Sequence, residues 1–377
     1  MTDHISKSVI LVFAGLTAPA ATAAQIPSAI QPTARISIGE AAGDTLEEFD
    51  RVVSPFLMPD GRLVVPLNSA STIRVFAADG RFLNSLGRKG SGPGEFLELH
   101  SVWSRGDTIE ALDWRLHRIT RFLPNGTVQT VMLRSGMHDV AAVSGPAGTD
   151  WLVGGVASSG YGRRDSVAVR RFARDGSDRG VVGVAAGFAR YQSPGISGPE
   201  PLSPRPVLQV HGGRLYIADN MMASIRVMQP NGAVERTITW APPRALSARD
   251  ALKMVIDSAV ARAPAARRPS ERRRWEDAPV RDRLPAFSTF LVDELGYIWV
   301  RPYDPFKHST ALGGLVLPGG GPGGRWTVLS PAGVRVGDID MPADLAPIRI
   351  TSDAVVGIAH DEFGVESVRV HALQRRR

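Results

Sequence analysis

The feature that most constrains the fold is a recurring hairpin signal, in which Asp-Gly or Asn-Gly separates two short apolar strands. These dipeptides permit the positive backbone angles that a tight hairpin turn requires. The signal recurs at Pro59-Asp60-Gly61, Ala78-Asp79-Gly80, Pro124-Asn125-Gly126, Arg174-Asp175-Gly176 and Pro230-Asn231-Gly232, and Pro331-Ala332-Gly333 takes the same place once more. A chain with so many hairpin turns is predicted to be all-β and built from antiparallel strands.

The strands predicted around these turns group into repeating units of four. The units recur roughly every 40–50 residues, which is the length of one blade of a β-propeller. They cover Val52–Ser85, Leu99–Leu133, Asp139–Val184, Val207–Trp240, Phe287–Ile339 and Ile348–Leu373. The last unit has only three strands, and the strand predicted over Arg35–Gly39 has no neighbour of its own. We therefore predict one domain over residues 35–373, a six-bladed β-propeller of four-stranded antiparallel blades whose last blade is closed by this N-terminal strand.

A glycine-rich stretch from Leu86 to Phe96, Leu-Gly-Arg-Lys-Gly-Ser-Gly-Pro-Gly-Glu-Phe, joins the first two units. No helix is predicted after it, which argues against a phosphate-binding loop. The turn predicts a positive φ at Gly92 or Gly94. With Leu215-Tyr216-Ile217-Ala218-Asp219-Asn220 and Ile225-Arg226-Val227-Met228, this stretch resembles the NHL-repeat six-bladed propellers of the TolB-like superfamily. The resemblance implies a fold that binding proteins, lyases and lactonases share, so it leaves the activity open.

The N-terminal residues indicate where the protein works. Residues 1–24 combine Lys7, an apolar run from Val9 to Leu16 and the small residues Ala21-Thr22-Ala23, which predicts a signal peptide. The run is too short to span a bilayer, and no later run is apolar enough, so no transmembrane segment is predicted. The chain has no cysteine, which excludes disulfides and a lipid-anchored lipoprotein. We expect an exported protein, periplasmic or extracellular.

The charge of the chain bears on its partners. The formal net charge is +7, which favours anionic partners. The basic residues form no stripe interleaved with aromatic residues, so nucleic acid is not expected. The partner left open by the sequence is a small molecule, a glycan or a peptide, with an anionic one favoured, and nothing in the sequence indicates an oligomeric state.

All the long insertions are predicted on one face of the propeller, formed by the loops between second and third strands and the crossings between blades. One insertion, over residues 245–284, is predicted to be a helical lid. It begins with the capping pattern Ser247-Ala248-Arg249-Asp250, and Leu252, Val255 and Ile256 follow at helical spacing. Its arginines from Arg267 to Arg274 indicate either an anion-facing edge or a solvated helix. Because ordered loops often carry sites, this loop-rich face is the predicted binding face.

The candidate ligand-binding residues lie mostly where the chain leaves a second strand for that face. Aromatic rings there would stack on a sugar or an aromatic ring, and arginines would hold a carboxylate. The candidates are Glu95, Trp114, Arg115, Asn220, Arg301 and Tyr303. Each has a structural alternative, because polar side chains cap turns and aromatic rings fill gaps between blades. For Glu95 the glycine-lined turn itself offers backbone N–H groups to the carboxylate.

No catalytic residue set is predicted. The chain has no Gly-x-Ser-x-Gly motif and its histidines are isolated in sequence. The first hypothesis is therefore a non-enzymatic binding protein, and whether the protein is an enzyme stays open. The alternative is a metal-assisted hydrolase or lyase of the propeller lactonase or amidating-lyase type. A divalent ion such as calcium would then lie at the axis, with Glu95, Asp113 and Asn220 available as oxygen ligands although their spacing does not mark them as a set. A structural role in an envelope assembly is the third hypothesis.

Overall fold

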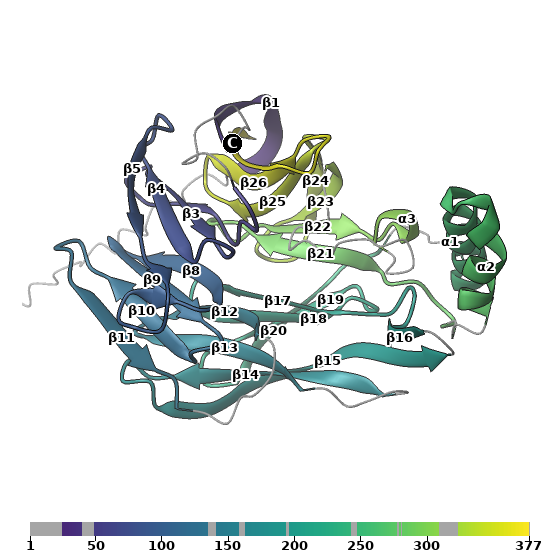
Figure 1. Cartoon of the computed structure of the whole chain (residues 1–377), viewed down its shortest axis with the longest axis horizontal. Coiled ribbons are helices and arrows are strands. Elements are labelled where there is room, and N and C mark those ends of the chain that lie inside the picture. Colours follow the sequence, from purple (N-terminus) through teal and green to yellow (C-terminus); the bar gives the residue numbers. More distant parts are fainter. Residues whose placement is uncertain are drawn as a thin grey trace, which may run out of the picture.

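The computed structural model describes residues 25–39, 49–134, 141–157, 163–193, 196–242, 247–276, 279, 281–308 and 323–376. Its strands form six antiparallel sheets, the blades of a propeller (Figure 1), which confirms the predicted fold. The predicted signal peptide, residues 1–24, lies outside the described residues.

The first five blades follow the order of the chain, with the first strand of each blade innermost. Blade 1 contains β2 (Phe56–Leu57), β3 (Leu63–Leu67), β4 (Thr72–Phe76) and β5 (Phe82–Leu86), and blade 2 contains β8 (Leu99–Arg105), β9 (Thr108–Asp113), β10 (Arg118–Phe122) and β11 (Val128–Met132). Blade 3 contains β12 (Ala141–Ala147), β13 (Asp150–Ala157), β14 (Arg164–Phe172), β15 (Asp178–Ser193) and a fifth strand, β16 (Ile196–Pro199). Blade 4 contains β17 (Pro206–His211), β18 (Arg214–Asp219), β19 (Ser224–Met228) and β20 (Val234–Thr239), and blade 5 contains β21 (Phe287–Val292), β22 (Ile298–Pro302), β23 (Gly324–Leu329) and β24 (Arg335–Met341).

Blade 6 is closed by the N-terminal strand, as predicted. It is built from β25 (Leu345–Ile350), β26 (Ala354–His360) and β27 (Glu366–Arg376), with β1 (Ile26–Ile38) as its outermost strand. The pairing of β1 with β27 runs from Ile26 opposite Arg376 to Ile38 opposite Val368. The closing strand therefore begins at Ile26 rather than at Arg35, because β27 extends far enough to pair with the additional residues.

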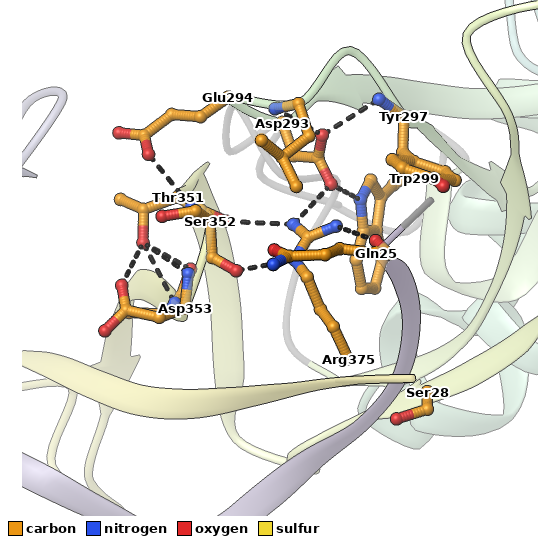
Figure 2. A network of polar contacts seen from close by, with 12 residues as sticks. Gln25, Ser28, Asp293, Glu294, Tyr297, Trp299, Thr351, Ser352, Asp353 and Arg375 are labelled. Atoms are coloured by element: carbon orange, nitrogen blue, oxygen red, sulfur yellow. Dashed lines mark hydrogen bonds and ion pairs between the residues drawn. The ribbon is translucent and has the colours of Figure 1, made fainter. Parts of the chain in front are cut away.

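A buried arginine fastens this closure (Figure 2). The guanidinium of Arg375 on β27 donates to Asp293 Oδ2 at 2.7 Å and to the carbonyl oxygens of Ser352 at 2.5 Å and Gln25 at 3.1 Å. Asp293 lies in the turn between β21 and β22, and it also accepts the indole N–H of Trp299 at 3.1 Å. One side chain thus connects the residue before β1, blade 6 and blade 5.

The core is divided among the spaces between successive blades. Each of six clusters of buried apolar side chains joins two neighbouring blades, including blades 6 and 1. Trp151, Trp299 and Trp326 are among the largest side chains with no exposed surface. Because every blade buries both of its faces against neighbours, the ring depends on all six blades together.

Two faces of the ring differ in their loops. The hairpin face carries the turns between first and second and between third and fourth strands, such as Asp60-Gly61 and Asn231-Gly232. The loop-rich face carries the crossings between blades and the loops between second and third strands. One crossing is the glycine loop, which contains the short paired strands β6 (Arg88–Lys89) and β7 (Glu95–Phe96).

The crossing between blades 4 and 5 holds the predicted lid. It contains α1 (Ala248–Arg262), the 3₁₀ turn η1 (Ala265–Arg267) and α2 (Arg268–Glu276). The hydroxyl of Ser247 accepts the backbone N–H of Asp250 at 3.1 Å, which confirms the predicted cap. Figure 1 shows α1 and α2 side by side at one edge of the molecule, beyond α3 and the tip of β15. A further short helix, α3 (Pro305–His308), follows β22 and was not predicted from the sequence. Within the described ranges, no helix has the length and apolar character needed to cross a membrane.

Candidate functional site

The polar residues that follow the second strands hold the crossings between blades. Asn68 Nδ2 donates to the carbonyl oxygen of Leu99 at 2.6 Å, and Asp113 Oδ2 accepts the backbone N–H of Leu97 at 2.6 Å. Asn220 Oδ1 accepts the backbone N–H of Arg205 at 2.6 Å. Asn220 is only 1% exposed. The candidate Asn220 is therefore part of the framework beneath the loop-rich face.

The carboxylate of Glu95 is held by its own loop. Oε2 accepts the backbone N–H of Gly92 at 2.7 Å and Oε1 accepts Arg88 Nε–H at 2.9 Å. These two contacts lower the pKa of Glu95, and the hydrogen bond from Gly92 has the larger effect. The predicted positive φ occurs at Gly94, at +77°. Gly90 also has a positive φ, and a Cβ there would lie 2.2 Å from Glu95 Oε2, so the loop needs glycine to enclose the carboxylate.

Trp114 and Arg115 are neighbours in sequence with opposite surroundings. The Trp114 side chain belongs to the buried cluster between blades 2 and 3 and is 7% exposed. Its ring lies edge-on to His117, with the centroids 5.6 Å apart. Arg115 is exposed on the loop-rich face. The aromatic ring thus fills a gap between blades, and the arginine remains accessible.

Arg301 and Tyr303 come together beneath the lid with Arg205 and Asp304, two residues that were not among the predicted candidates. Arg301 lies next to the end of β22 and is only 3% exposed. Burial lowers the pKa of both Arg205 and Arg301, and it raises the pKa of Tyr303 above its usual range. The Arg205 guanidinium also lies 5.6 Å from the ring centroid of Phe188. The four charged or titratable side chains at this place are two cations, one carboxylate and one phenol, and we call them the lid cluster.

The lid covers this cluster with a small apolar core of its own. Tyr303 packs against buried side chains that include Leu202, Leu252 and Trp275. Arg205 could have been linked to the candidate Asn220 only through the strand register, because Arg205 precedes Pro206 and Pro206 pairs with Asp219. The sequence does not show this register, so it could not place Arg205 at the site.

Several other arginines of the loop-rich face and lid bind carboxylates or carbonyl oxygens of the protein itself. Arg88 pairs with Glu95, and Arg164 forms an ion pair with Asp219. In the lid, Arg272 pairs with Asp257 at 2.8 Å, and Arg268 Nε donates to the carbonyl oxygen of Ala263 at 3.2 Å. These two lid arginines connect α2 to α1, which fits the interpretation of a solvated helix better than that of an anion-facing edge.

The possible oxygen ligands for a divalent ion are dispersed. Glu95 and Asn220 each bind a backbone N–H nearby, and Asp113 Oδ1 accepts the backbone N–H of Leu116 at 2.8 Å. In the part of the chain that the structure describes, no three His, Cys, Asp or Glu side chains lie close enough together to hold a metal ion.

Comparisons with known proteins define the class. Residues 45–127 match the model of the family DUF5128, a 6-bladed beta-propeller. Among solved structures, a member of the DUF4221 family from Bacteroides vulgatus has a TM-score of 0.52 at 9% identity, over 94% of this chain and 100% of that one. Together with the six observed blades, these matches place the chain among the six-bladed β-propellers.

Two further structures resemble the chain less closely. Virginiamycin B lyase from Staphylococcus aureus has a TM-score of 0.41 at 9% identity, over 85% of this chain and 94% of that one. A Bacteroides fragilis protein, whose export is itself only inferred, has a TM-score of 0.49 at 12% identity, over 89% of this chain and 93% of that one. No curated protein matches the sequence. At such identities the likeness concerns the fold alone, and membership of the NHL-repeat group stays a prediction.

Proposed function

We propose that the protein is an exported, non-enzymatic binding protein that holds an acidic ligand on its loop-rich face, at the lid cluster. The observation that carries this proposal is that two guanidinium groups, those of the buried Arg301 and the half-buried Arg205, gather with Tyr303 under the lid. Guanidinium groups bind carboxylates in a geometrically specific, bidentate way, so two of them in one place favour a ligand that carries a carboxylate.

Each candidate residue has a separate part in this proposal. Arg301 and Arg205 bind the ligand carboxylate, and Tyr303 offers its ring and hydroxyl. Arg115 contributes positive charge at the rim. Asn220 supports the cluster by accepting the backbone N–H of Arg205, whereas Glu95 and Trp114 keep structural parts in other blades. Because Arg301 is almost fully covered, the lid must move aside for the ligand to enter, and its small separate core makes that motion cheaper than opening the ring.

Export is the second half of the proposal. The signal-like residues 1–24 end just before β1, so a cut after residue 24 would leave the whole closing strand in the mature chain. N-terminal sequencing of the protein recovered from the periplasm or the medium tests this. A mature N-terminus within β1 would contradict it, because the closing strand would then be shortened.

The ligand proposal is tested with immobilised protein and two oligosaccharides of equal length, a polygalacturonate fragment and an uncharged glucan fragment. We expect selective binding of the acidic oligomer that weakens as salt rises. Arg301→Ala should weaken it about tenfold, the equivalent of roughly 1.4 kcal/mol. Arg115→Ala should weaken it about twofold, as expected for an exposed rim charge. Arg335→Ala, an exposed arginine paired with Asp338 on β24, is the matched control.

Two outcomes would contradict the proposal. Equal binding of the acidic and neutral oligomers would show that the ligand need not be acidic. Undiminished binding by folded Arg301→Ala protein would show that the lid cluster is not the binding site. Metal analysis of the purified protein decides on the alternative function. One tightly bound divalent ion per chain would favour the metal-assisted hydrolase or lyase.

A further inference from the structure

A second place in the molecule has the character of a binding site, and it lies at the opposite end of the ring. A cavity of about 200 Å³ opens inside the ring of innermost strands, close to the hairpin face. Its lining comes from five of the six blades: Phe56, Trp103, Ser104, Gly145, Pro146, Val210, His211, Gly212 and Arg349. Because the innermost strands surround the propeller axis, this cavity is axial. It shares Gly212 with a larger depression of about 530 Å³ between blades 3 and 4, which leads to the hairpin face.

No described residue compensates the charge in the axial cavity. The side chain of Arg349, on the innermost strand β25, makes no hydrogen bond or ion pair with any residue in the described part of the chain. Burial lowers the pKa of its guanidinium. The lining contains no aspartate or glutamate. A guanidinium has five N–H donors, so a partly enclosed one without an acceptor is a cost to the fold.

Neighbouring arginines on the same face show how unusual this is. Arg105 and Arg121 both bind the buried carboxylate of Glu110, and Arg375 binds Asp293. In the larger depression, Arg171 pairs with Asp150 and Arg214 pairs with Glu235. Among the described residues, the hairpin face therefore supplies a carboxylate to each of these five arginines but none to Arg349.

The remaining lining adds neutral hydrogen-bonding groups and apolar walls. Burial lowers the pKa of His211; the negative charge of Asp293 opposes this effect and the positive charge of Arg349 adds to it. Near neutral pH, His211 is therefore an uncharged imidazole, with one donor and one acceptor nitrogen. Ser104 contributes a hydroxyl. The indole N–H of Trp103 is already bound to Glu110 at 2.8 Å, so Trp103, like Phe56, offers only its apolar ring.

We propose that the axial cavity is a binding site for a small organic monocarboxylate with an apolar body, anchored by Arg349 and hydrogen-bonded by His211 and Ser104. The guanidinium takes the carboxylate, and the Phe56 and Trp103 rings flank the apolar part of the ligand. The volume suits a small molecule, because one liquid water occupies about 30 Å³. This site is separate from the lid cluster, so it adds a second ligand to the proposed function.

The test uses calorimetric titration of the intact protein with three probes: benzoate, its uncharged analogue benzamide, and inorganic phosphate. We expect benzoate to bind once per chain, and benzamide to bind at least about tenfold more weakly because it cannot compensate the guanidinium. Arg349→Met should remove benzoate binding. Arg335→Met, which changes an exposed arginine outside the lining, should leave it unchanged. Saturating acidic oligomer should not compete with benzoate, which separates this site from the lid cluster.

A stability measurement distinguishes a binding arginine from a structural one. Because the Arg349 side chain has no partner among the described residues, Arg349→Met should maintain or raise the melting temperature of the ligand-free protein. Arg349→Lys, which keeps the charge but loses the fork, should fold and bind benzoate several-fold more weakly. The proposal is overturned if phosphate binds and benzoate does not, if benzoate binds equally to Arg349→Met, or if millimolar benzoate fails to bind the folded wild-type protein.

Discussion

The closing blade and the lid both depart from the regular repeat, but they are held by different kinds of contact. In blade 6, β1 and β27 come from opposite ends of the chain, and their closure includes the ion pair of Arg375 with Asp293, whose side chains are 6% and 0% exposed. In the lid, α1 and α2 are consecutive, and the ion pair of Arg272 with Asp257 has side chains 49% and 47% exposed.

This difference separates the part that holds the ring from the part that covers it. Breaking a buried ion pair leaves an uncompensated charge and costs several kcal/mol, whereas an exposed pair is worth about 0–1 kcal/mol. The lid core is also separate from the six clusters between blades. We therefore expect the ring to unfold when β1 and β27 are separated, and to stay folded when the lid opens.

The largest effect should follow deletion of residues 24–40, which removes β1. The outer edge of β27 would then be unpaired, and Ile36 and Ile38 would leave the core between blades 6 and 1. We expect a large fall in the melting temperature and aggregation. Deletion of residues 1–24 alone is the control and should leave unfolding unchanged. A truncated protein with the thermal unfolding of the full ring would show that closure by β1 does not stabilise it.

The next effect should come from Asp293→Asn, which leaves Arg375 buried without its carboxylate partner. The free energy of unfolding should fall by about 3–5 kcal/mol. The matched change in the lid, Asp257→Asn, should cost at most about 1 kcal/mol because both side chains of its pair are exposed. Urea unfolding of the two variants measures the difference, and equal costs would contradict the comparison.

Much of the fold could be predicted because its signals are local. Each Asp-Gly or Asn-Gly turn indicates a hairpin from its own residues alone. The last blade then had only three predicted strands, so the unpaired N-terminal strand was assigned to it. The first part of β1 escaped prediction because Pro27 and Pro32 interrupt the alternation that marks a strand. An outermost strand tolerates proline, since one side of it has no ladder to complete. The helix α3 is too short to show a helical period.

The candidate site was less predictable, because burial and pairing decide what a polar residue does. Glu95 and Asn220 stood out by their motifs, yet their side chains bind backbone groups close by. Arg205 and Arg349 carry no motif. What distinguishes them is a buried guanidinium in a place that several blades assemble, and only the closed ring brings those blades together.

A smaller, local effect is expected from Leu252→Ala in the lid. Leu252 on α1 is 5% exposed, and its truncation should favour opening of the lid by about 2 kcal/mol. Hydrogen exchange should quicken at the α1 amides and stay slow at those of β26, deep in the ring. Lys253→Ala on the exposed side of the same helix is the control. Loss of protection throughout the blades would mean that lid and ring unfold as one unit.

The smallest effect concerns pH and is confined to alkaline solution. Burial raises the pKa of Tyr303, the nearby charge of Arg205 acts in the opposite direction, and that of Asp304 raises it further. Because the covered phenol holds its proton more tightly than an exposed one, its contribution to the closed lid is complete below the ordinary pKa of 10.0 and is lost as the pH rises above that value. Phenolate absorbance of wild-type protein minus that of Tyr303→Phe should therefore appear only above the ordinary range, together with faster proteolysis between α1 and α2. A difference titration at the ordinary tyrosine pKa would show that the lid leaves Tyr303 open to solvent. The lid would then not be a closed unit of its own beside the ring.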